Sequence, residues 1–305
     1  MWKAFITAAI LWLPAAALHA EQVVVETPQT AMVIDVTKGQ APQFVYYGPR
    51  LSRQQLEQLQ PAAVVGPDVC SAADPAIESA NGPSTRLVVT GVERLKNDLN
   101  QITVVHLKDL QCPITVDLKL MQYHDVDMIE VWAEITHNEA KAVMLPAFAS
   151  FLLPIRRSNV WMSSYGRSWG DEWQISDEPL FAGQRVIEPA PISPATYAPQ
   201  VVFSLDGWPR PSGCRVIGAA LCRPGGQRLP ATTAAPSDYR LLVTTGDSSD
   251  YHYLTVAPCE DSSHYRLSKG EPLHTPHVAL SFSTEGLSGV SRNFSKWGRK
   301  YKPQY

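Results

Sequence analysis

Hydrophobic and polar residues alternate with a period of two along the middle of the chain. Every second residue is apolar from Ile114 to Leu120, and again from Ile129 to Ile135. The short polar stretch 124–127 separates the two runs. Because successive side chains of a strand point to opposite faces of a sheet, this pattern predicts a β-hairpin with one buried face and one wet face.

Further segments show the same alternation and extend the prediction to most of the chain. They are residues 86–92, 102–107, 239–245, 251–256 and 277–283. The chain also has 25 prolines in 305 residues, about 8% against a usual value of roughly 5%. Proline at this frequency disfavours long helices, and no regular strand–helix alternation appears. We therefore expect an all-β protein built as a two-sheet sandwich.

Helical spacing appears at only two places. Ser52 with Gln55 forms a weak capping box, and Pro61 ends the short helix that follows. At the far end, apolar residues recur every three or four positions from Leu287 to Tyr301, with cations in the last turn. This is the pattern of an amphipathic helix with positive charge at its negative end. The sequence shows no obvious partner for its apolar face.

The overall charge limits the classes of partner. The chain carries 26 Lys and Arg against 29 Asp and Glu, a net charge of -3. A protein that binds a phosphate backbone would need clustered positive charge, so no nucleic-acid partner is expected. Hydrophobic residues make up 45% and charged residues 18%, which favours a buried core over disorder.

The first twenty residues resemble a secretory signal. Lys3 supplies a positive charge, residues 4–17 are apolar, and residues 18–20 offer a cleavage site before Glu21. Cleavage after Ala17 is an alternative, as is a buried N-terminal helix in place of a signal. The apolar run is too short to span a bilayer. We expect an exported protein, periplasmic or extracellular, with no membrane segment after the signal is removed.

The cysteine count is odd. The five cysteines are Cys70, Cys112, Cys214, Cys222 and Cys259. Export permits disulfides, and a bridge between Cys214 and Cys222 would close a small loop. Buried, inert thiols are the other interpretation, and the spacing is not that of a zinc site.

One loop concentrates side chains that suit a sugar. Within residues 165–173 lie Arg167, Trp169, Asp171, Glu172 and Trp173. Indole faces stack on pyranose rings while charged groups bind hydroxyls, so these residues are candidates for substrate binding. The alternative is structural: the tryptophans fill a gap at the edge of the sandwich and Arg167 pairs with Asp171.

The carboxylates of the chain do not form a glycosidase pair. Such a pair flanks one bond about 5–5.5 Å apart in retaining enzymes and about 6.5–9.5 Å apart in inverting ones. Asp171 and Glu172 are neighbours that point apart on an extended segment. Asp125 and Asp127 are expected in a solvated acidic turn. We therefore predict no catalytic residue in this chain.

Metal and cofactor sites are not predicted either. His106, His124 and His137 lie near strand ends, but no Asp/Glu-x-x-His grouping supports a metal site. No Walker loop, Rossmann fingerprint or Gly-x-Ser-x-Gly elbow is present.

Four stretches, in this order, resemble the N-terminal domain of glycoside hydrolase family 36, the α-galactosidases of bacterial and fungal type. They are residues 44–48 (FVYYG), the hairpin 116–136 with YHDV and EVWAEI, the loop 166–174 (GRSWGDEWQ) and residues 284–294 (TEGLSGVSRNF). The last two are quite specific, and the likeness runs from about residue 25 to residue 301.

The resemblance implies a large two-sheet β-supersandwich followed by a (β/α)₈ barrel. In the family, that barrel holds two catalytic aspartates, which work by a retaining double displacement. A barrel needs at least about 200 further residues, so both aspartates would lie outside this polypeptide. The domains expected are a signal peptide at 1–20, a β-supersandwich at 21–285 and a connector helix at 286–305.

The resemblance also implies partners. A loop of the family's sandwich domain can reach the galactose site of a neighbouring subunit, and Asp74 lies in the matching region, although the family's arginine is absent. We expect a non-catalytic domain of an exported α-galactosidase, with galactosides as ligands and a homo-oligomer in the full-length enzyme. The alternatives are a free-standing carbohydrate-binding module and an assembly scaffold.

Overall fold

Antiparallel sheets dominate the part of the chain that the structure describes. The computed structural model describes residues 21–59, 63–64, 70–71, 74–75, 86–110, 113–140, 143–145, 151–165, 175–188, 200–222, 239–246, 251–259 and 265–301. Within these ranges the regular structure is β-strand apart from two helices. The expected all-β class is therefore confirmed.

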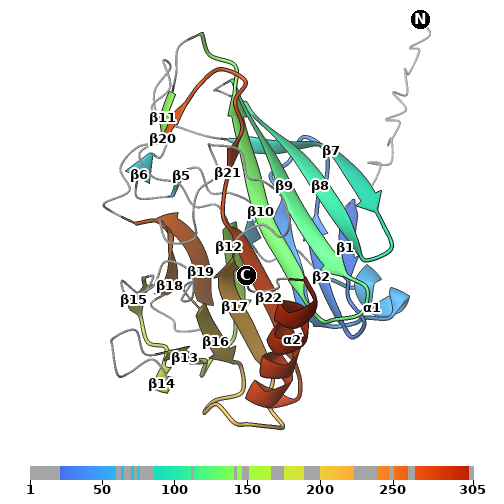
Figure 1. Cartoon of the computed structure of the whole chain (residues 1–305), viewed down its shortest axis with the longest axis vertical. Coiled ribbons are helices and arrows are strands. Elements are labelled where there is room, and N and C mark those ends of the chain that lie inside the picture. The colour runs from blue at the N-terminus through green and yellow to red at the C-terminus, as the bar shows by residue number, and fades with distance from the viewer. Residues whose placement is uncertain are drawn as a thin grey trace, which may run out of the picture.

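A large sheet of ten strands runs through the molecule (Figure 1). Its order is β14 (Ile175–Pro179), β13 (Trp161–Tyr165), β16 (Gln200–Ser204), β17 (Val216–Cys222), β22 (His277–Ser283), β10 (Ile129–His137), β9 (Ile114–Tyr123), β8 (Asn100–Asp109) and β7 (Leu87–Lys96), with β21 (Leu273–His274) paired to β10. The strand β22 therefore lies in the interior of the sheet, hydrogen-bonded to β17 on one side and to β10 on the other.

The facing layer is divided into two four-stranded sheets. One is formed by β1 (Gln22–Glu26), β2 (Thr30–Asp35), β3 (Gln43–Pro49) and β4 (Ala63–Val64); the other by β12 (Phe151–Arg156), β19 (Tyr251–Pro258), β18 (Tyr239–Thr245) and β15 (Gly183–Ile187). Two small ladders join β11 (Val143–Leu145) to β20 (Tyr265–Leu267) and β5 (Cys70–Ser71) to β6 (Asp74–Pro75).

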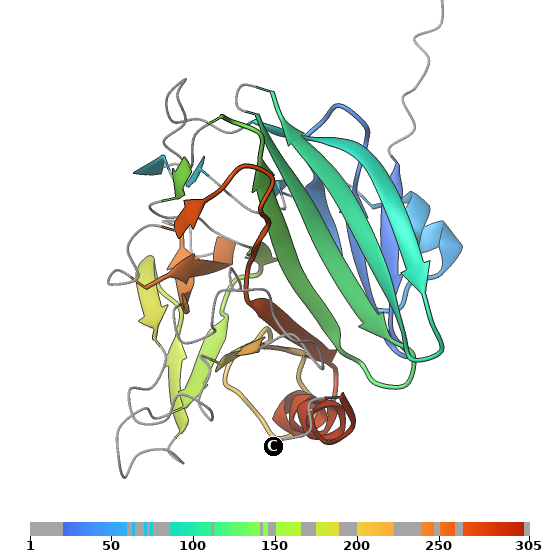
Figure 2. The same cartoon turned by 45° about the horizontal axis from the view of Figure 1, so that its top comes forward.

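One continuous core joins the layers. Val25 of β1, Leu118 of β9 and Leu254 of β19 all belong to the same cluster of buried side chains. Figure 2 shows the first strands lying behind the sheet that contains β7–β10. The molecule is therefore the expected large sandwich, with its smaller layer split into two sheets.

The predicted hairpin is present, with a difference on one face. β9 and β10 pair in register from Ile129↔Gln122 to His137↔Ile114. On β10, however, Glu130 and Trp132 are buried, although the period-two pattern placed them on the wet face. Other parts of the chain cover this face, as the contacts of Glu130 described below show.

Both predicted helices form. The short helix α1 (Arg53–Glu57) begins at Ser52, whose side chain and that of Gln55 make the expected capping box. The helix α2 (Gly286–Tyr301) packs on β22 and β17, and it is seen almost end-on in Figure 2. Val290 and Trp297 are buried there. The expectation that its apolar face has no partner is therefore wrong, because the large sheet supplies one.

The cysteines that the structure describes in full are consistent with the thiol interpretation. The Cys214 thiol donates to the carbonyl oxygen of Arg210, and the Cys222 thiol lies 3.9 Å from the Glu130 carboxylate. The bridge between Cys214 and Cys222 is therefore not formed. The side chains of Cys70 and Cys112 lie outside the described residues.

The proposed signal peptide also lies outside the described residues, so the boundary at residue 21 stays a prediction. Among the residues that are described, no helix has the length and apolarity needed to cross a membrane.

Candidate functional site

The side chains predicted to bind sugar fall largely outside the described residues. Arg167, Trp169, Asp171, Glu172 and Trp173 lie between β13 and β14, whose ends pair at Tyr165↔Ile175. Asp74 is in β6, where its backbone pairs with Ser71, and its side chain lies outside the described residues. These six assignments stay predictions.

The structure instead brings together the β9–β10 hairpin and the helix α2. At the centre is Glu130 of β10, which is fully buried. Its carboxylate accepts hydrogen bonds from the Tyr123 hydroxyl, from the indole N–H of Trp297 at 3.2 Å and from Nδ1 of His277 at 2.7 Å. Trp132 stacks on the His277 ring, with centroids 4.0 Å apart. A buried carboxylate is tolerated only when its oxygens are satisfied in this way.

This Glu130 cluster ties α2 to the sheet through a shared acceptor. Tyr123 comes from β9, His277 from β22 and Trp297 from the fourth turn of α2. Burial, together with the adjacent Glu130 carboxylate, raises the pKa of Tyr123 far above its usual range, so the hydroxyl stays a donor. If α2 separated from the sheet, the buried Glu130 carboxylate would lose the hydrogen bond from Trp297, and such a loss costs free energy.

A second set of polar contacts fixes the far end of α2. Asp125, in the β9–β10 turn, accepts from the Lys300 ammonium at 2.6 Å and from the Tyr301 hydroxyl. These two hydrogen bonds lower the pKa of Asp125. Asp127, in the same turn, accepts from the Thr27 hydroxyl at 2.8 Å. The turn expected to be a solvated acidic bend is therefore a structural junction.

Backbone hydrogen bonds hold the first turn of α2. Gly286 has a φ of 70°, and a Cβ there would meet the carbonyl oxygen of Arg210 at 2.6 Å. The N–H groups of Gly286 and Leu287 donate to the carbonyls of Cys214 and Arg210, at 2.9 and 3.0 Å. Helix N-termini leave such donors without partners inside the helix, and here the turn before β17 satisfies them.

A glycine on β17 lets the helix approach the sheet. A Cβ added to Gly218 would lie 2.5 Å from Cγ1 of Val290 and 2.8 Å from Cε2 of Phe294. Only a residue without a side chain fits under α2 at this position.

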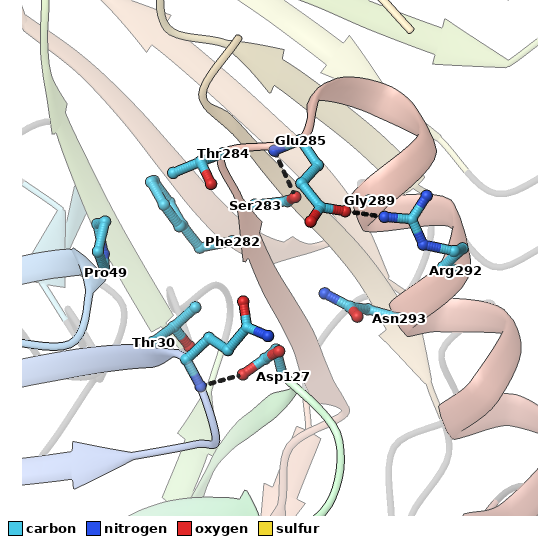
Figure 3. Close-up of a pocket in the computed structure, with 11 residues that line it drawn as sticks. Thr30, Pro49, Asp127, Phe282, Ser283, Thr284, Glu285, Gly289, Arg292 and Asn293 are labelled. Carbon is cyan, nitrogen blue, oxygen red and sulfur yellow. Dashed lines mark hydrogen bonds and ion pairs between the residues drawn. The ribbon is translucent and has the colours of Figure 1, made fainter. Parts of the chain in front are cut away.

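A polar pocket of about 380 Å³ opens beside α2, where β2, the β9–β10 turn and the end of β22 meet (Figure 3). Asp127 lines it from the β9–β10 turn and Asn293 lines it from α2, and the ring of Phe282 lies on the side toward Pro49. The Glu285 carboxylate forms an ion pair with Arg292. The pocket is thus lined by both hydrogen-bond donors and hydrogen-bond acceptors.

A larger pocket of about 610 Å³ lies on the other side of α2, against the β13–β16–β17 edge. Leu287, Val290 and Phe294 line it from the helix, and Val202 and Ile175 line it from the strands. Ile175 is the first residue after the loop predicted to bind sugar. The return of that loop into β14 is therefore at the rim of this pocket.

Comparison with known proteins identifies the family of this domain. The model of the glycosyl hydrolase family 36 N-terminal domain matches residues 40–222, more than half of the chain. The chain belongs to this family. This match confirms the family that the four ordered motifs indicated. No curated protein matches its sequence.

Solved structures share the fold of this family 36 domain. The α-galactosidase from Lactobacillus brevis is 16% identical with a TM-score of 0.74, over 92% of this chain and 42% of that one. The α-galactosidase AgaB from Geobacillus stearothermophilus is 15% identical with a TM-score of 0.73, over 96% and 43%. The galactosidase domain of AgaSK is 16% identical with a TM-score of 0.73, over 96% and 44%. This chain thus spans less than half the length of these structures.

The acids of the polar pocket are arranged for structure rather than for hydrolysis. Asp127 accepts from Thr27 and from the backbone N–H of Gln29 at 2.7 Å, while Glu285 is salt-bridged and largely exposed. A general acid for glycoside cleavage is held protonated in an apolar site, which neither environment provides.

Histidines and acids do not converge on a metal in the described part of this family 36 domain. His106 bonds to Asp117 at 2.8 Å, His124 to the carbonyl of Asp98 at 3.3 Å and His137 to the carbonyl of Leu267 at 2.9 Å. Each ring makes a separate structural contact.

Proposed function

We propose that this chain is the non-catalytic supporting domain of an α-galactosidase-type glycoside hydrolase, and that α2 is the connector to a separate catalytic unit that hydrolyses terminal α-galactosyl residues. Family membership and the fold of the α-galactosidase N-terminal regions support this proposal. The observation that carries it is the attachment of α2, which is locked to the sandwich at both ends and through its middle.

Rigid attachment is what a connector needs, because a catalytic pocket that shares its walls with a second domain requires a fixed geometry between the two. The Glu130 cluster supplies it, and within that cluster Tyr123 and Glu130 come from the hairpin that resembles the family. The outward face of α2 stays exposed and holds small and cationic side chains. These are Ser288, Ser291, Ser295, Lys296 and Arg299. We propose this face and the exposed rim of the polar pocket as the contact with the catalytic unit.

The test compares the purified 305-residue chain with a protein that adds whatever catalytic unit its gene region encodes after Tyr305. We expect no turnover of 4-nitrophenyl α-galactoside by the chain alone, and turnover by the joined protein. Turnover by the chain alone, in a preparation free of contaminating enzyme, would overturn the proposal. A gene region with no glycoside hydrolase unit would overturn it as well.

Export and assembly belong to the same proposal. Sequencing the N-terminus of the protein recovered outside the cytoplasm should begin at Glu21, or at Leu18 if cleavage follows Ala17. Recovery of intact Met1 would contradict export. Light scattering of the joined protein should give a homo-oligomer, and a monomer at all concentrations would contradict that part.

A further inference from the structure

Two tryptophans outside the predicted sugar loop meet at the surface. Trp161 begins β13, and Trp208 lies in the turn between β16 and β17. Their ring centroids are 4.6 Å apart and their planes are inclined at 64°. Trp208 is 58% exposed. An edge-to-face contact supports one ring while leaving a face of the other in water, so Trp208 presents an indole surface that nothing in the described chain covers.

The turn that carries Trp208 is held in place before any ligand arrives. The N–H of Leu205 donates to the carbonyl of Arg215 at 2.9 Å. The Arg215 backbone N–H donates to the Asp206 carboxylate at 2.9 Å, and its Nε donates at 3.0 Å. Gly207 has a φ of 90°, and a Cβ there would lie 3.0 Å from Nδ2 of Asn159. A preorganised turn loses little entropy on binding.

The charges around this ring do not cancel. Asp206 and Arg215 neutralise each other as a bidentate pair. The hydrogen bonds from Arg215 and the nearby charge of Arg157 lower the pKa of Asp206 to about 2. The Arg157 side chain is exposed and, among the described residues, makes no ion pair or side-chain hydrogen bond. One guanidinium therefore stays available near Asp206, which lies two residues before Trp208 in the same turn. Asn159 is also exposed, so its side-chain amide is accessible to a ligand.

We propose that Trp161 and Trp208, with Arg157 and Asn159, form a binding site for an acidic saccharide. A pyranose ring stacks on the exposed face of Trp208, and a ring carboxylate pairs with the Arg157 guanidinium in the planar geometry that arginine favours. The Asn159 amide hydrogen-bonds a hydroxyl. A hydroxyl can accept from Arg157, but a carboxylate pairs with it through two charge-assisted hydrogen bonds, which is why the site fits a uronic-acid unit better than a neutral sugar. The proposal does not depend on the proposed function above.

The probe is trigalacturonate, with neutral galactotriose as its matched control, each titrated up to about 10 mM against the 305-residue chain by calorimetry and tryptophan fluorescence. We expect trigalacturonate to bind with a dissociation constant of about 1 mM or tighter and to shift the indole emission. Trp208→Ala should weaken binding about tenfold, in line with the loss of one stacking face. Arg157→Gln should weaken it similarly and remove its dependence on salt.

Phe181→Ala is the matched control, because Phe181 is another apolar side chain, 63% exposed, between β14 and β15. It should leave the affinity unchanged. The proposal is overturned if trigalacturonate gives no signal, if galactotriose binds equally well, or if Trp208→Ala binds like the parent. Loss of binding in Trp169→Ala or Trp173→Ala, with Trp208→Ala unaffected, would assign the sugar to the 166–174 loop and would overturn it too. Circular dichroism confirms that each variant is folded.

Discussion

Replacing Gly218 with alanine should loosen α2 from the sheet. The added Cβ would lie 2.5 Å from Cγ1 of Val290 and 2.8 Å from Cε2 of Phe294, both closer than real Cβ contacts. Either the two side chains leave their rotamers or the helix shifts outward. Overpacking of this kind costs about 1–3 kcal/mol of unfolding free energy. For a domain of this size, a loss of about 2 kcal/mol lowers the melting temperature by about 4–8 °C.

Gly91→Ala is the matched control for this prediction. Gly91 is also a strand glycine, on β7, and a Cβ there would meet no atom within 4 Å. Removing a glycine where alanine fits the backbone stabilises by about 0.4–1 kcal/mol through the unfolded state. The two substitutions are chemically identical, so their difference isolates the contact with α2.

Urea unfolding followed by tryptophan fluorescence measures both variants, since Trp297 reports directly on the helix. A second readout is tryptic cleavage within α2, which should accelerate in Gly218→Ala only. Equal midpoints for the two variants, or an unchanged cleavage rate in Gly218→Ala, would refute the claim that this glycine holds the helix against β17.

Three further predictions concern the polar contacts. Tyr123→Phe removes only the hydroxyl that donates to the buried Glu130 carboxylate, so we expect its free energy of unfolding in urea to fall by about 2 kcal/mol. Tyr46→Phe is the control: its hydroxyl bond is exposed, so its free energy of unfolding should change by less than about 0.5 kcal/mol. The pKa of Asp206 is lowered to about 2 in the fold, below the unfolded value of about 3.9, so this carboxylate stabilises the fold above pH 3.9 and the contribution is lost as pH falls through 2. The partial exposure of the pair keeps this contribution under about 1 kcal/mol, and Asp206→Asn should flatten the acid limb of the urea midpoint. Lys300→Met removes the ion pair with Asp125, and the resulting small drop in melting temperature should vanish in about 1 M sodium chloride.

Strands with one wet face were predictable from the sequence, whereas of the strands buried on both faces the alternation marked β22 but not β2 or β17. The alternation in 114–120 and 239–245 marked β9 and β18, whose burial alternates residue by residue. β2 is buried at every position, so its sequence TAMVID has no polar period to detect. β17 is similarly covered, because α2 lies over it.

The candidate site was harder to predict because its parts come from distant segments. Glu130 sits at a position that the hairpin pattern assigns to solvent, and its burial depends on His277 and Trp297, which are 147 and 167 residues away. The helical spacing of Trp297 was visible in the sequence, but nothing in that spacing indicates which sheet it faces. The likeness to the family marked the hairpin 116–136 and residues 284–294, but His277 and Trp297 lie outside both stretches.

The position of β22 determines how force passes between α2 and the sandwich. This strand leads straight into the helix and is bonded along both edges, to β17 and to β10. Tension on α2 therefore reaches an interior strand, which cannot peel away one pair at a time as an outermost strand can. Its ladders must be sheared together. Any body carried on α2 would move with the sandwich as a single unit, and thermal hinge motion at this junction would be small.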